Sequence, residues 1–129
     1  MKSTFVIIGA LLAALAVALG AFGAHGLKTL VEQGKFPAKD LETFHTAVQY
    51  QMTHALGLIL IGLLAAARPS VLLEAAGWTM FVGILVFSGF LYAYVATGMK
   101  PFAMFVPIGG VAFIVAWLGV AVAVAAMRR

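Results

Sequence analysis

Residues 43–67 read TFHTAVQYQMTHALGLILIGLLAAA and contain no Asp, Glu, Lys or Arg. An α-helix rises about 1.5 Å per residue and the hydrocarbon core of a bilayer is about 30 Å thick, so about 20 apolar residues are enough to cross it. Because backbone amides in lipid must form hydrogen bonds within their own segment, this run is predicted to be a transmembrane helix. Three further stretches share its length and its lack of charge: residues 3–27, 75–99 and 101–127. The sequence therefore predicts four membrane spans.

The composition indicates the same class of protein. Soluble domains carry about 25% charged residues, whereas this chain of 129 residues is 9% charged and 64% hydrophobic. Four helices with short links use nearly the whole chain, so we predict a single all-α transmembrane domain over residues 1–129. The predicted fold is an integral membrane four-helix bundle with a short amphipathic segment after the first helix. The helices are expected at about residues 4–24, 38–67, 72–96 and 101–127.

The basic residues predict contact with lipid headgroups rather than with nucleic acid. The net charge is +4, but the lysines and arginines stand singly or in one pair near helix ends, where they face anionic headgroups. They divide four against four: Lys2, Arg68, Arg128 and Arg129 on one side of the membrane, and Lys28, Lys35, Lys39 and Lys100 on the other. The positive-inside rule therefore favours neither orientation of the chain in the membrane. The terminal arginine pair leads us to expect both termini in the cytoplasm.

The links carry signals for where helices begin and end. The apolar run from Phe5 to Gly23 is longer than the core of a usual signal peptide, so we predict a retained first helix. Residues 26–35 have the mixed pattern of a short amphipathic turn at the membrane surface. Prolines 101 and 107 leave two alternatives open. The last helix begins at Pro101 and kinks at Pro107, or residues 101–106 form a non-helical dip into the membrane edge.

Small side chains recur on one face of the first and of the last span. Such stripes let a neighbouring backbone approach closely. We therefore expect these two spans to form the closest helix pair. Because four thin helices enclose little volume, we also expect a homo-oligomer. The predicted packing positions are Gly9, Ala13, Ala16 and Gly20 in the first span, and Gly109, Ala112, Ala116 and Gly119 in the last.

Polar residues inside the spans are the candidates for function, because polar groups at membrane depth are costly and face the bundle interior. We expect a cluster in which His54 and Gln51 reach Ser88 and Tyr92 across the contact between the second and third spans. Three interpretations stay open: hydrogen bonds that set helix register, a titrating or ligand-binding His54, and a metal or haem held by two of the three histidines. The candidate positions are His25, Tyr50, Gln51, His54, Ser88 and Tyr92.

Catalysis and tightly bound groups are not predicted. Ser88 and His54 form the one conceivable nucleophile–base pair, and the acidic residues lie in the links, too far away to complete a triad. The chain has no cysteine, and His45 and His54 are nine residues apart, so they cannot converge on one metal from a straight helix. We predict no enzymatic activity, no metal site and no cofactor.

Four sequence blocks resemble the small membrane proteins grouped as domain of unknown function 423, which include bacterial inner-membrane proteins and the eukaryotic transmembrane protein 256. The blocks are GAFGAHGL (20–27), TAVQYQMTHAL (46–56), FSGFLY (87–92) and PIGG (107–110). Phe90 departs from the small residue expected there, which would narrow a pocket. The resemblance implies four transmembrane helices in a bacterial inner membrane, and no established activity.

Three functions are compatible with these residues. The first is a non-enzymatic binding or assembly module whose helix faces engage membrane lipid or another membrane protein. The second is a small transporter or channel subunit in which His54 takes up and releases protons. The third is a redox subunit that binds a metal or haem. The sequence names no substrate, ligand or partner for any of them.

Overall fold

The computed structural model describes residues 2–128, so Met1 and Arg129 of the predicted 1–129 domain lie outside it. Residues 2–128 contain helices and short links and no strand. Four helical rods are long and apolar enough to cross a membrane, as predicted. In chain order the helical elements are α1 (Lys2–Phe22), η1 (Gly23–Leu27), α2 (Lys28–Glu32), α3 (Lys39–Ala67), α4 (Val71–Ile84), η2 (Leu85–Gly89), α5 (Phe90–Thr97) and α6 (Lys100–Met127), where η1 and η2 are π-helical turns.

The first rod is longer than predicted. The helix does not end near residue 24 but continues through η1 and α2 to Glu32. The segment that we expected to be a separate amphipathic turn is therefore the end of the first helix itself. The helix continues through Gly26, and the chain breaks at Gly34, whose φ of 77° lies in the left-handed region that glycine tolerates.

The other helix ends follow the local chemistry. Ser70 caps α4 by accepting a hydrogen bond from the Leu73 amide at 3.3 Å. Gly98, with φ of 70°, ends α5 in the left-handed conformation. The last helix begins at Lys100 with Pro101 in its first turn and Pro107 inside the helix. Of the two alternatives for residues 101–106, the helical one is confirmed.

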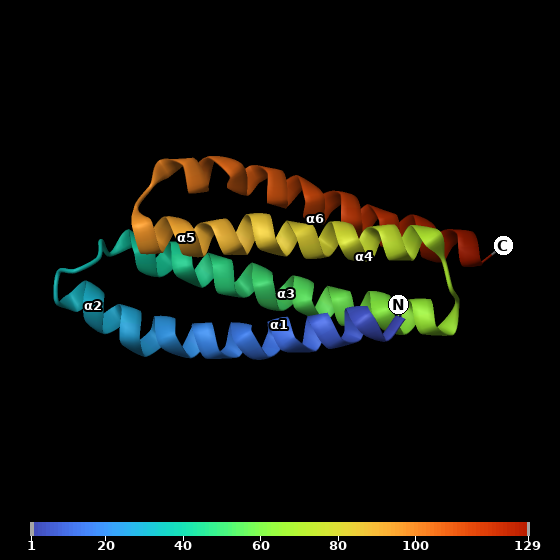
Figure 1. Cartoon of the computed structure of the whole chain (residues 1–129), viewed down its shortest axis with the longest axis horizontal. Helices are drawn as coiled ribbons and strands as arrows, with labels where there is room; N and C mark the ends of the chain where they lie inside the picture. The colour runs from blue at the N-terminus through green and yellow to red at the C-terminus, as the bar shows by residue number, and fades with distance from the viewer. Residues whose placement is uncertain (1, 129) are drawn as a thin grey trace.

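The four rods run back and forth along the long axis of the molecule, with the links at its two ends (Figure 1). α1 packs along α3, and α6 packs along α4. Phe5 of α1 also reaches Gly77 of α4, and Phe113 of α6 stacks on His54 of α3. α3 and α4 thus lie in the middle of the bundle, and α1 and α6 flank them. The predicted pairing of the first span with the last was wrong.

The small-residue stripes instead meet the two central rods. A Cβ added to Gly9 would lie 2.6 Å from the carbonyl oxygen of Ala55 in α3. A Cβ added to Gly119 would lie 3.3 Å from Ala76 in α4. The remaining stripe positions differ in depth: Ala16, Gly109 and Ala116 are buried, and Ala13, Gly20 and Ala112 are half-buried.

Apolar side chains fill the interior and also cover the outside. The interior cluster joins all four rods through residues such as Phe5, Leu58, Met80 and Phe113, each less than 5% exposed. On the outside, Leu11 is 66% exposed, which is the surface expected of a rod solvated by lipid. At the end of the bundle that holds both termini, Arg68 donates a hydrogen bond from Nη1 to the carbonyl oxygen of Met127 at 2.7 Å.

Candidate functional site

Gln51 joins three rods of the bundle. Its Nε2 donates a hydrogen bond to the carbonyl oxygen of Leu12 in α1 at 2.8 Å, and its Oε1 accepts one from the Tyr92 hydroxyl of α5 at 2.6 Å. Long side chains in a helix lean toward its N-terminus. Because α3 and α5 run in opposite directions, Gln51 and Tyr92 lean toward each other and meet. The predicted contact of Gln51 with Tyr92 is present.

Ser88 makes a separate link between α3 and the third rod. Its hydroxyl is buried in η2 and donates a hydrogen bond to the carbonyl oxygen of Ala47 at 2.7 Å. A serine side chain commonly bonds to a carbonyl of its own helix. Here it bonds across the helix interface instead, and so fixes the position of η2 against α3.

His54 does not join the Gln51–Tyr92 pair, which corrects the predicted cluster. Its Nδ1 lies 2.7 Å from the carbonyl oxygen of Tyr50, one turn earlier in the same helix. That contact requires the proton on Nδ1 and leaves Nε2 as an acceptor. The ring stacks on Phe113 of α6 with centroids 3.5 Å apart, and Trp117 lies beside it. We did not predict these aromatic neighbours, because an apolar span carries no signal for which aromatic side chain faces a histidine.

The other predicted positions lie nearer the surface. His25 in η1 is exposed, and its carbonyl oxygen accepts a hydrogen bond from the Thr29 hydroxyl at 2.9 Å. Tyr50 is 43% exposed, and its ring stacks on Phe87 with centroids 4.3 Å apart. Across residues 2–128, no three His, Cys, Asp or Glu side chains gather closely enough to hold a metal ion.

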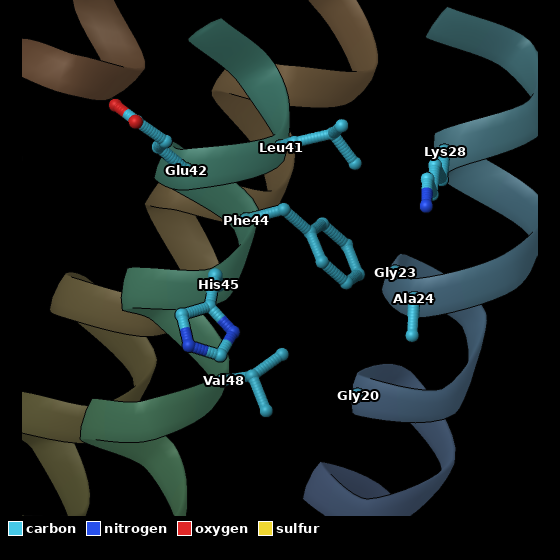
Figure 2. Close-up of a pocket in the computed structure, with 9 residues that line it drawn as sticks. All are labelled: Gly20, Gly23, Ala24, Lys28, Leu41, Glu42, Phe44, His45 and Val48. Atoms are coloured by element: carbon cyan, nitrogen blue, oxygen red, sulfur yellow. The ribbon is translucent and has the colours of Figure 1, made fainter. Parts of the chain in front are cut away.

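A groove of about 430 Å³ separates the end of the first rod from the start of α3 (Figure 2). On the first rod it is lined by three small residues and one lysine, and the space that the small residues leave forms the groove. On α3 it is lined by larger side chains. The lining residues are Gly20, Gly23, Ala24 and Lys28 from the first rod, and Leu41, Glu42, Phe44, His45 and Val48 from α3.

The side chains of the groove are arranged with charge at one end and apolar groups along its length. Figure 2 shows the Phe44 ring directed across the groove toward Gly23, where an added Cβ would lie 2.9 Å from the ring. Lys28 lies on the first rod at the end of the groove nearer the link, and the carboxylate of Glu42 is directed away from that rod. The groove therefore has apolar walls and a cation near its mouth.

Most of this groove was missed from the sequence. Gly20 was assigned to close helix packing, but a Cβ added there would lie 3.4 Å from Val48, an ordinary contact. His45 stands outside the recognisable sequence blocks and was not among the candidate positions. The one available signal was the small residues Gly20, Gly23 and Ala24 followed one turn later by Lys28.

The helices, their apolar exterior and the buried polar links define a four-span integral membrane protein. Residues 19–110 match the family described as protein of unknown function (DUF423), and the chain belongs to this family. All six candidate polar residues lie within the matched range. The predicted family resemblance is confirmed.

Bacterial relatives match over nearly their whole length. The UPF0382 membrane protein YwdK of Bacillus subtilis is 48% identical over 120 residues, which cover 92% of this chain and 94% of that protein. A UPF0382 membrane protein of Staphylococcus epidermidis is 44% identical, with 92% and 93% covered. One of Staphylococcus aureus is 46% identical, with 88% of each chain covered. These names specify a membrane protein and no activity. No solved structure matches the chain.

Proposed function

We propose that this protein is a non-enzymatic membrane module that binds an anionic phospholipid in the groove between the first rod and α3. The observation that carries the proposal is the combination of an apolar groove with Lys28 near its mouth. The volume of about 430 Å³ lies within the roughly 300–1,000 Å³ typical of small-molecule sites. Ala24 and His45 of its lining are exposed, so surrounding lipid can reach the groove.

Charge selects the class of lipid. A lysine near the membrane surface attracts an anionic headgroup by about 1 kcal/mol. Lys28 is exposed, and its ammonium group can reach a headgroup phosphate while an acyl chain lies along Gly20, Ala24 and Val48. His45 adds a second hydrogen-bonding group on the α3 side. The rest of the wall is apolar except for Glu42, whose carboxylate is directed away from the first rod, and this favours a hydrocarbon chain over a polar metabolite.

The lipid site is tested by native mass spectrometry of the protein in mild detergent supplied with phosphatidylglycerol or phosphatidylcholine of identical acyl chains. We expect phosphatidylglycerol to be retained preferentially, and Lys28→Gln to weaken its binding about five-fold, equivalent to about 1 kcal/mol. Lys35→Gln, which changes a lysine outside the groove, is the matched control and should leave binding unchanged.

A second pair of variants separates the groove from general surface attraction. Ala24→Phe fills the groove and should abolish retention of the lipid, whereas Ala18→Phe, at an exposed alanine of α1 outside the groove, should not. Equal retention of both lipids, or retention of phosphatidylglycerol that Ala24→Phe leaves intact, would contradict the proposal.

We further propose that the protein lies in the bacterial inner membrane with both termini in the cytoplasm, which places Lys28 and the mouth of the groove at the outer leaflet. The chain has no native cysteine, so single cysteines can report on this orientation. A membrane-impermeant maleimide added to intact spheroplasts should label Lys35→Cys and spare Val71→Cys, whose site is 87% exposed at the start of α4, at the end of the bundle that holds the termini. The reverse labelling pattern would invert the orientation.

A further inference from the structure

The outward face of α3 carries polar side chains into the membrane. Gln49 and Thr53 are exposed and lie four and eight residues beyond His45, which stands near the start of the charge-free run 43–67. At about 1.5 Å per residue they are about 6 and 12 Å deeper than His45. A polar side chain at that depth is unfavourable when it faces lipid, and such residues ordinarily face protein or a water-filled cavity.

Neither side chain is satisfied by its own chain. Thr79 and Thr97 turn their hydroxyl groups onto carbonyl oxygens of their own helix, at 2.8 and 2.7 Å. Among the side-chain hydrogen bonds within residues 2–128, none involves the hydroxyl of Thr53 or the side-chain amide of Gln49. Their donors and acceptors are available to a partner.

The same face continues as a row of exposed leucines. Leu56 is 55% exposed, Leu60 is 44% exposed and Leu63 is 58% exposed. Together with Gln49 and Thr53 these residues follow one another at spacings of four, three, four and three, the repeat by which two helices pack in a left-handed pair. In such a pair, a polar residue within an apolar seam sets the register of the two helices.

We propose that a second copy of this chain packs against this face, so that the two α3 helices lie side by side about a two-fold axis normal to the membrane. Two copies inserted with the same orientation place identical residues opposite each other. A glutamine amide and a threonine hydroxyl each donate and accept hydrogen bonds, so each can pair with its own copy. The self-complementary chemistry of Gln49 and Thr53 is why the partner is a second copy rather than an unrelated helix.

A hollow beside this face provides room for the partner. It has a volume of about 580 Å³ and lies between α3 and Trp117 of α6. His54 lies in its wall, with Nε2 as the acceptor that its contact with Tyr50 leaves unused. Side chains of the partner can therefore enter the hollow between α3 and α6. The hollow is lined by Gln49, Tyr50, Met52, Thr53, His54 and Trp117.

The interface is tested by cross-linking in native membranes. Because the chain lacks cysteine, oxidation of a Thr53→Cys variant with copper phenanthroline should give a covalent dimer of this chain. Ile114→Cys, whose site is 61% exposed on α6 at the level of the His54 contact, is the matched control and should stay monomeric. Equal cross-linking of both variants, or cross-linking of Thr53→Cys to a different protein, would overturn the proposal.

The polar contact is tested by the association constant in lipid nanodiscs, measured by energy transfer between labelled copies. We expect Gln49→Leu to weaken association by about 5- to 30-fold, the loss that corresponds to interhelical hydrogen bonds in lipid. Gln49→Asn, which keeps both the hydrogen-bond donor and the acceptor, should restore most of the association. Unchanged association in Gln49→Leu would contradict the proposal. Ala24→Phe should leave association intact, so that failure of the lipid site and failure of this interface are distinguishable.

Discussion

Phe113→Ala is expected to lower the free energy of unfolding by about 3 kcal/mol. Phe113 is 4% exposed, stacks on His54 with centroids 3.5 Å apart and lies against Gly83 of α4. Its removal leaves a cavity where α6 meets both central rods. Phenylalanine-to-alanine changes in protein cores cost about 3–5 kcal/mol. We expect the lower end of this range of destabilisation, because lipid is itself apolar and the variant loses mainly packing contacts.

The measurement is unfolding in mixed micelles of mild detergent and dodecyl sulfate, followed by tryptophan fluorescence. Trp117 lies beside His54, so the part of the fluorescence that Trp78 does not contribute reports on this contact. Phe105→Ala is the matched control, since Phe105 is in the same helix and is 51% exposed. We expect it to change stability by less than about 0.5 kcal/mol. Equal effects of the two variants would show that Phe113 does not hold α6 in place.

Gly109→Ala is expected to destabilise the protein by about 1–3 kcal/mol, while Gly110→Ala should be neutral or slightly stabilising. A Cβ added to Gly109 would lie 2.8 Å from the Cβ of Phe87 in η2 and 2.5 Å from the backbone nitrogen of the same residue. Because backbone cannot rotate away, α6 and η2 must separate. At Gly110 the nearest atoms are 3.9 Å away, an ordinary contact.

The two neighbouring glycines form their own control, because the substitution, the helix and the membrane depth are nearly the same. The midpoint of thermal unfolding in one detergent should fall for Gly109→Ala and hold or rise for Gly110→Ala. A similar fall for both variants would contradict the interpretation that the close approach of α6 to η2 at Gly109 causes the destabilisation.

The spans were predictable because charge is excluded from them. The predicted helix 38–67 became Lys39–Ala67, and the predicted helix 72–96 became the rod from Val71 to Thr97. Proline at 101 and glycine at 98 mark real ends. Such signals are local, so a single sequence contains them.

The pairing of the spans was not predictable in the same way. A stripe that contains Gly9 or Gly119 identifies the face on which a neighbour comes close, but not which helix that neighbour is. In a soluble bundle the polar outer face narrows the choice, whereas here every face is apolar. The candidate site shows the same limit: Gln51 and Tyr92 were correctly placed together, and His54 was wrongly placed with them.

The two π-helical turns change which face of the helix is occupied by the residues that follow them, and the spacing of residues in the sequence does not show this. A π turn holds one residue more than an α turn, so everything beyond it is rotated by about 100° relative to an unbroken helix. η1 ends directly before Lys28 of the groove, and η2 ends three residues before Tyr92, which bonds to Gln51. A relative that is one residue shorter within 23–27 or 85–89 would thus keep four spans while presenting a different surface. Gaps at these two places are the ones to inspect when a property of one family member is transferred to another.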